Sequence, residues 1–319
     1  MSVLTRRALI GPVAALLVLA ACQNAGNSPG ASSGATQSSG GSPSQAAVSS
    51  PVATVPTAQL AFAGILTTCI DIPYPPQEFF DAQGNPTGAD PDLANEIAKR
   101  LGLSSRIENS VFSTIIEAVT SGKCDIIISA QNLNAERLGQ VNMIPYFQAG
   151  QAFVVAKGNP KGIHAELDLC GKKAAAETGT TEVDYVNGTG DYKGGGLNKK
   201  CADASKAAVD MQQFEKDTDA LLALSAGSVD AYFADSPVAG YYTVQQPDQF
   251  ELSGVTVEIA QEGISVPKEK KELGAAVVTA LTSMEADGKY LEILTKYGLE
   301  DGAVAATEMK LVTKLVTGS

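Results

Sequence analysis

A helix–glycine–strand pattern that occurs twice constrains the fold of this chain more than any other feature. Residues 118–128 show it first, and residues 223–233 repeat it 105 residues later. Such segments build parallel sheets covered by helices on both faces. Ala130 and Asp235 follow the two strands, where open α/β sheets bind their ligands. A match this short also arises by chance, but it predicts two lobes with facing polar edges.

The size of the folded part supports this division. It is predicted to span residues 58–319, about 260 residues, which is near the size at which one hydrophobic core gives way to two. Strands are expected at residues 65–70, 124–129, 151–156 and 263–266. Helices are expected to begin at Asp92, Ser113 and Asn134, and to cover residues 273–286 and 290–297.

The N-terminus reads as an export signal that ends in a lipid-attachment cysteine. Arg6 and Arg7 precede an apolar run over residues 8–21, and small residues lead into Cys22. The run is too short to cross a bilayer of about 30 Å as a helix. Residues 1–21 are therefore predicted to be a lipoprotein signal peptide, which leaves the protein lipid-anchored to the bacterial cell membrane outside the cytoplasm. An ordinary signal peptide is the alternative, and the two arginines fit either a general or a twin-arginine signal.

The segment after the cysteine is predicted to be a disordered tether. Residues 23–57 contain no charged residue and are rich in Ser, Gly and Ala, a composition that cannot bury enough apolar surface to fold. With Cys22 they form a linker over residues 22–57. Its root-mean-square reach of about 30 Å would hold the folded part clear of the membrane.

Charge and histidine content exclude several classes of function. The formal net charge is −12, and without residues 1–21 the chain keeps 21 basic and 35 acidic residues, so the mature form carries −14. An acidic surface disfavours nucleic acid as a partner. His164 is the only histidine and lies in a polar connection, which argues against a Ser-His-Asp triad or a histidine-rich zinc site. We therefore expect no catalytic residue, no metal and no cofactor.

Four cysteines remain after lipidation, an even number in an oxidising compartment. Cys170 and Cys201 flank a glycine-rich stretch, residues 188–196, that a disulfide would restrain, and we predict this bond. Cys69 and Cys124 each lie in an expected strand. They form a disulfide if the strands are neighbours, and two buried thiols otherwise.

Several residues near the expected cleft suit a small zwitterion. Arg137, at a helix start, can clamp a carboxylate with two parallel hydrogen bonds. The Thr180-Thr181 turn opens a helix whose free N–H groups favour an anion. Asp235 can accept hydrogen bonds from an ammonium group, and Tyr74 and Phe112 can flank an apolar stem. Each also fits an ordinary structural role, so the set matters more than its members.

Six segments form an ordered series along the chain: Asp71-Ile-Pro-Tyr74-Pro-Pro-Gln-Glu-Phe, Gly88-Ala-Asp90-Pro-Asp92-Leu-Ala, Gly122-Lys-Cys-Asp125-Ile-Ile-Ile-Ser, Asn134-Ala-Glu-Arg137, Gly179-Thr-Thr181 and Ala234-Asp-Ser-Pro-Val-Ala239. This series closely resembles the family 3 solute-binding proteins of polar amino acid ABC transporters, the group of the periplasmic glutamine- and histidine-binding proteins. The resemblance covers nearly all of residues 60–300.

The resemblance implies a fold with two α/β lobes, the type II periplasmic-binding-protein-like fold. Lobe 1 would comprise residues 58–147 and 263–319, and lobe 2 residues 152–257. Two hinge strands would join the lobes, crossing near residues 147–151 and 258–263.

The resemblance also implies a role for each candidate residue. Arg137 and the Thr180-Thr181 turn would hold the α-carboxylate of an amino acid, and Asp235 its α-ammonium group. Tyr74 and Phe112 would stack on the side chain of the ligand, and Asp71 would bind the distal polar end of that side chain.

Two positions depart from the family pattern. Ala130-Gln131-Asn132 stands where members have glycine, an apolar residue and Ser or Thr, so Asn132 brings an amide where a hydroxyl is expected on the carboxylate. Ala130 and Asn132 are kept among the ligand-binding candidates. Gln77 stands where an aromatic residue is common. Both changes add polar groups to the cleft. This fits a polar ligand but does not identify it.

The sequence thus predicts a monomeric extracellular lipoprotein that captures a polar amino acid, or a similar small zwitterion, between two lobes. It would deliver this ligand to an ABC permease driven by a cytoplasmic ATPase. One alternative is an enzyme like cyclohexadienyl dehydratase on the same fold, which needs an acidic group that no residue obviously adds. Another is a sensor lipoprotein that reports ligand without transport.

Overall fold

The computed structural model describes residues 50–315. The predicted signal peptide, Cys22 and most of the predicted tether lie outside the described residues, as do residues 316–319. No helix within residues 50–315 has both the length and the apolar character needed to span a membrane.

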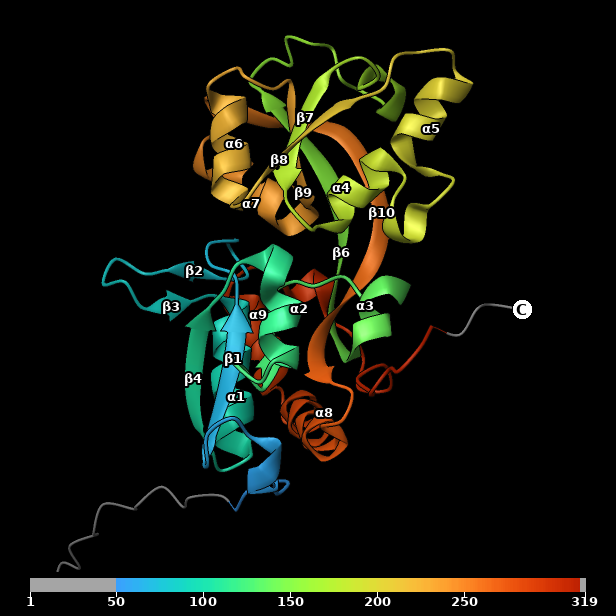
Figure 1. Cartoon of the computed structure of the whole chain (residues 1–319). Helices are drawn as coiled ribbons and strands as arrows, with labels where there is room; N and C mark the ends of the chain where they lie inside the picture. Colours follow the sequence, from blue (N-terminus) through green and yellow to red (C-terminus); the bar gives the residue numbers. More distant parts are fainter. Residues whose placement is uncertain (1–49, 316–319) are drawn as a thin grey trace, which may run out of the picture. The chain divides into compact units, whose positions relative to one another are not determined.

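One mixed sheet of eight strands organises the described part of the chain (Figure 1). In sheet order the strands are β4 (Ser104–Asn109), β1 (Ile65–Ile70), β5 (Ile126–Ile127), β10 (Phe250–Pro267), β6 (Val141–Ala156), β9 (Ala231–Asp235), β7 (Lys173–Glu177) and β8 (Asp210–Phe214). A separate ribbon pairs β2 (Phe79–Phe80) with β3 (Pro86–Thr87). The parallel pairing expected from the sequence is present only toward the two ends of the sheet. Its centre is antiparallel because β10 returns along nearly the whole length of β6.

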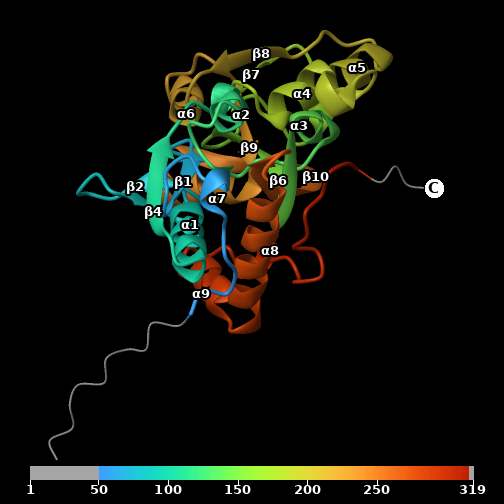
Figure 2. The ribbon, with the colours of Figure 1, turned by 60° about the horizontal axis from the view of Figure 1, so that its bottom comes forward.

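Helices pack around both ends of the sheet (Figures 1 and 2). They are α1 (Ala89–Arg100), α2 (Ile115–Thr120), α3 (Ala135–Gln140), α4 (Thr181–Asn187), α5 (Gly196–Asp203), α6 (Asp217–Ser225), α7 (Ser236–Gln245), α8 (Lys271–Ala286) and α9 (Lys289–Lys296). We call β1, β4 and β5 with α1–α3, α8 and α9 the first lobe. The second lobe is β7–β9 with α4–α7.

Each lobe has its own apolar core. In the first, Leu66, Leu93 and Leu281 belong to one buried cluster. In the second, the rings of Phe153 and Phe233 stack with their centroids 3.8 Å apart. The long strands β6 and β10 run through both lobes and join them, which is the two-lobe type II arrangement expected. The residue limits assigned to the lobes and hinges stay predictions.

The first helix begins earlier than expected. Asp92 was expected to cap it, but α1 starts at Ala89 with Gly88 as its N-cap. A side chain at residue 88 would clash, because a Cβ atom there would lie 2.2 Å from the backbone oxygen of Gln77 and the backbone has φ of 124°. Asp90 and Asp92 instead lie in the first turn, where a negative charge favours the helix.

Two other elements are shorter than the sequence suggested. The helix expected from Ser113 begins as a 3-10 turn over Phe112–Thr114, and α2 starts only at Ile115. The strand expected over residues 124–129 is paired only at Ile126–Ile127. The side chain of Asp125 accepts hydrogen bonds from two backbone N–H groups before this strand, and Ala130 has a left-handed backbone after it.

The folded part begins before residue 58, which corrects the predicted end of the tether. The backbone N–H of Val52 donates to the carbonyl oxygen of Arg100 at 2.9 Å. Val55 is buried in the core of the first lobe. Residues 50–57 therefore belong to the fold, since Val55 supplies apolar surface that the core can bury.

Both cysteine pairs form disulfides. Cys170 and Cys201 are bonded with their Cα atoms 5.6 Å apart, as predicted. Cys69 and Cys124 are also bonded, with a Cα separation of 5.7 Å, so the open alternative of two thiols is excluded. The first strand, β1, pairs directly with β5, which brings these two residues together.

Candidate ligand-binding cleft

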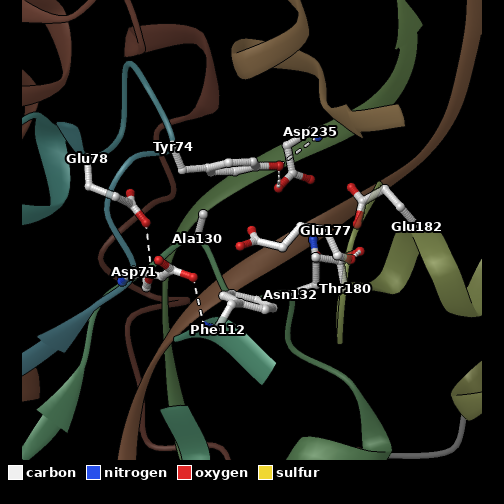
Figure 3. A pocket seen from close by; sticks show the side chains of 11 residues that line it. Asp71, Tyr74, Glu78, Phe112, Ala130, Asn132, Glu177, Thr180, Glu182 and Asp235 are labelled. Carbon is white, nitrogen blue, oxygen red and sulfur yellow. Dashed lines mark hydrogen bonds between the residues drawn. The ribbon is translucent and has the colours of Figure 1, made fainter. Parts of the chain in front are cut away.

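A pocket lies between the two lobes and takes residues from both (Figure 3). Seven of the nine candidate ligand-binding residues line it: Asp71, Tyr74, Phe112, Ala130, Asn132, Thr180 and Asp235. Four further lining residues were missed in the sequence: Glu78, Ser129, Glu177 and Glu182. Most of these residues follow the carboxyl ends of β1, β5, β7 and β9, where parallel strands present ligand-binding groups.

At one end of the pocket, Tyr74 and Asp235 connect the lobes. The Tyr74 hydroxyl donates to Asp235 Oδ2 at 3.0 Å and accepts from the Asp235 backbone N–H at 2.9 Å. Asp235 Oδ1 is buried and has no hydrogen-bond partner among residues 50–315. Burial raises the pKa of Asp235 to about 7. The hydrogen bond from Tyr74 and the positive charge of Arg137 oppose this shift and lower the pKa. An ammonium group at this oxygen would supply the missing partner and favour the charged carboxylate.

At the other end, Asp71 and Glu78 are held by a chain of hydrogen bonds. Asp71 Oδ2 accepts from the backbone N–H of Phe112 at 2.7 Å, and the Asp71 N–H donates to Ser129 Oγ at 2.9 Å. Ser129 Oγ donates in turn to Glu78 Oε1 at 2.7 Å. Burial raises the pKa of Glu177 to about 10, and the neighbouring Asp71 charge adds to the shift. This end therefore holds several buried carboxyl groups whose charge depends on a nearby cation.

Arg137 lies beside the pocket and does not line it. Its Nη1 donates to the carbonyl oxygen of Asn132 at 2.8 Å, and its Nη2 to that of Gly179 at 3.2 Å. The guanidinium carbon lies 5.3 Å from the centroid of the Phe112 ring. Burial lowers the pKa of Arg137, while the nearby Glu182 raises it. Its role as a carboxylate clamp stays a prediction.

Thr181 also lies behind the pocket wall and links three elements. Its Oγ1 donates to Asn132 Oδ1 at 2.6 Å and accepts from Gln151 Nε2 at 2.8 Å. The Asn132 Nδ2 group is buried without a hydrogen-bond partner in the described part of the chain. The Asn132 amide, which departs from the family pattern, thus connects the first lobe to α4. Thr180, in contrast, lines the pocket.

Gln77, the second residue that departs from the family pattern, belongs to a buried polar cluster next to the pocket. Gln77 Nε2 donates to Glu262 Oε2 on β10 at 2.6 Å, and the Tyr146 hydroxyl donates to Asp90 Oδ2 at 2.8 Å. Burial raises the pKa of Asp90 to about 7 and that of Glu78 well above its usual value, with repulsion from Asp90 adding to the second shift. Gln77 therefore contacts the centre of the sheet and is absent from the pocket lining.

Sequence signals existed for two of the missed acids. Glu177 ends β7, two residues before Gly179, so the rule that placed Asp235 at a strand end applies to it as well. Glu182 adjoins Thr181 in the first turn of α4, a position where an acid usually only stabilises the helix. In the structure it is buried, and burial followed by repulsion from Asp235 raises its pKa to about 8.

Comparisons with known proteins identify the family. The family model described as bacterial extracellular solute-binding proteins, family 3, matches residues 66–300. The arginine-binding protein ArgT of Corynebacterium glutamicum is 30% identical over 251 residues, which cover 78% of this chain and 79% of that protein. The histidine-binding periplasmic protein of Salmonella typhimurium is 26% identical over 76% of this chain and 91% of its own length.

Solved structures agree in fold. An ancestral arginine-binding protein bound to arginine has a TM-score of 0.66 and 35% identity, covering 74% of this chain and 98% of its own. An ancestral amino acid-binding protein, a precursor of cyclohexadienyl dehydratase, has a TM-score of 0.63 and 30% identity over 73% of this chain and 95% of its own. The relatives named are binding proteins of amino acids. This chain belongs to the bacterial extracellular solute-binding proteins of family 3.

Proposed function

We propose that the protein is a lipid-anchored, monomeric binding protein of an ABC importer and that its ligand is an amino acid with a cationic side chain. The observation that carries this proposal is the number of acidic side chains in the pocket. Five acidic side chains line it, Asp71, Glu78, Glu177, Glu182 and Asp235. No Lys or Arg among residues 50–315 lines the pocket, although Lys216 pairs with Asp71. Arginine is the ligand in the names of several relatives.

The carboxylates fall into two groups along the pocket. In Figure 3, Asp235 and Glu182 lie toward one end and Asp71 and Glu78 toward the other, with Glu177 between them. Buried carboxylates that repel one another lose their charge unless cations are supplied. An α-ammonium group at the first end and a guanidinium or ammonium group at the second would supply both. A side chain with its own carboxylate would add repulsion.

Delivery is proposed to follow from closure of the lobes. Tyr74 and Asp235 already join the lobes, as do Asn132 and Thr181. A ligand that contacts both lobes would stabilise this closed form, and the permease would recognise it. Cys22 would hold the protein at the membrane through its lipid, outside the cytoplasm, as the predicted signal peptide requires.

Titration calorimetry of the purified mature protein tests the ligand class. We expect L-arginine to bind best, L-glutamine at least about tenfold more weakly, and L-glutamate not measurably, because each step removes a cation or adds an anion. Preferential binding of L-glutamate, or no binding of any of these amino acids, would refute the proposed ligand class.

The affinity for L-arginine is expected to rise by about tenfold from about pH 6 to about pH 8. In the ligand-free protein burial raises the pKa of Asp235 to about 7, so at the lower pH this carboxyl group carries a proton that the ligand's ammonium group must expel. Above this pKa the Asp235 carboxylate is already charged and releases no proton. Calorimetry in two buffers of different ionisation enthalpy measures the released proton. An affinity that is constant or falls with rising pH would contradict this account, and Asp235→Asn should reduce the pH dependence.

A further inference from the structure

Lys216, in the second lobe, pairs with the carboxylate of Asp71, in the first lobe. Its Nζ forms an ion pair with Asp71 Oδ1, although the residues are 145 positions apart. The other oxygen of Asp71 accepts from the Phe112 backbone N–H at 2.7 Å. The Asp71 side chain is 5% exposed, whereas that of Lys216 is 26% exposed. Asp71 is thus a buried carboxylate whose counter-cation comes from the chain itself and keeps a path to solvent.

The surroundings of Lys216 leave its ammonium group free to pair with Asp71. The adjacent carboxylate, Asp217, accepts hydrogen bonds from the hydroxyls of Tyr232 and Tyr242, the second at 3.2 Å. Asp217 is buried, and its two oxygens are held by these tyrosines, which belong to β9 and α7. Glu177, the other acid close to Asp71, has no ion pair with a lysine or arginine among the described residues.

A buried carboxylate cannot lose its counter-charge without a large penalty. If the ligand's side chain ends in a cation, that cation can take the place of the Lys216 ammonium group, which then turns into solvent. If the side chain is neutral, Asp71 keeps its charge balanced only when Lys216 remains. The same pocket can therefore receive both kinds of ligand as long as the lysine is present.

We propose that Lys216 is a specificity-determining residue, an exchangeable internal cation that lets the cleft accept neutral polar amino acids beside cationic ones and that links the lobes when no ligand is bound. This inference rests on the proposed function for its statement about ligands. Its statement about the ligand-free protein depends only on the ion pair across the cleft.

The test compares L-arginine with L-citrulline, whose side chain has nearly the same shape but ends in a neutral ureido group. Calorimetry gives the ratio of their affinities for the unmodified protein and for Lys216→Met, which keeps the length of the side chain and removes its charge. We expect this ratio to rise by at least about tenfold in Lys216→Met, because arginine no longer competes with the lysine and citrulline leaves Asp71 unpaired. Lys216→Arg should keep the original ratio.

Lys200→Met is the matched control. Lys200 also belongs to the second lobe, but it pairs with Glu166 away from the pocket, so the ratio should not change. A ratio in Lys216→Met within about twofold of the unmodified protein would overturn the proposal about specificity.

Small-angle scattering without ligand separates this proposal from the proposed function. Lys216→Met should have a larger radius of gyration than the unmodified protein and than Lys200→Met, and adding Asp71→Asn should increase it no further. If neither amino acid binds the unmodified protein, the proposed function fails while this comparison remains informative. An unchanged radius of gyration in Lys216→Met would overturn the link between the lobes.

Discussion

Arg137→Ala is expected to weaken the binding of L-arginine by about 2 to 5 kcal/mol, as the removal of one partner from a buried charged contact does. The guanidinium group is buried and donates to the carbonyl oxygens of Asn132 and Gly179, which belong to different lobes. A ligand carboxylate beside the Arg137 guanidinium would replace these two neutral carbonyl acceptors by a charged acceptor, which forms stronger hydrogen bonds. The variant therefore loses both the proposed carboxylate partner and a contact that favours the closed form.

Arg137→Lys is not expected to restore binding, because an ammonium group lacks the planar fork that reaches two acceptors at once. Arg106→Ala is a matched control, since Arg106 lies on the exposed edge strand β4 with its guanidinium over the ring of Phe62. Calorimetry gives the affinities, and thermal unfolding without ligand checks that each variant is folded. A folded Arg137→Ala protein with native-like affinity would remove Arg137 from the site.

The fold could be predicted where the signal was local or carried by the ordered motifs. The run from Ile65 to Ile70, the capping residue Asn134 and the Cys170–Cys201 pair all took the expected structure. The antiparallel centre of the sheet was not evident from alternating strands and helices, because the pairing of β6 with β10 joins segments about a hundred residues apart. The cap at Gly88 depended on its close approach to Gln77, a contact that no helix-capping rule contains.

In the site, too, residues with a local sequence signal could be predicted, and residues that depend on tertiary contacts could not. Asp235 could be placed near the cleft because parallel strands end at one edge of a sheet, whereas Asp71 was assigned only through the family resemblance. The orientation of the Arg137 side chain could not be predicted, since it depends on two carbonyl groups from separate lobes. Lys216 gave no signal at all. It follows an unremarkable edge strand, and only the folded chain brings it to Asp71.

The second large effect concerns the α-groups of the ligand. We expect L-arginine methyl ester to bind at least about a hundredfold more weakly than L-arginine, a loss of about 2.7 kcal/mol, because the ester removes the negative charge proposed to face Arg137. N-acetyl-L-arginine should lose a similar amount, since it cannot offer an ammonium group to the unpartnered oxygen of Asp235. L-arginine amide serves as a control for the size of the ester group.

The proposed function depends on closure of the lobes, because a ligand that binds Arg137 of the first lobe and Asp235 of the second gains its full interaction only when both residues reach it. Small-angle X-ray scattering of the mature protein, with and without L-arginine and with its methyl ester at the same concentration, measures closure directly. We expect L-arginine to give a smaller radius of gyration than that of the ligand-free protein, and the methyl ester to leave the ligand-free value unchanged. Equal compaction by both compounds, or compaction only by ligands without a carboxylate, would contradict this expectation.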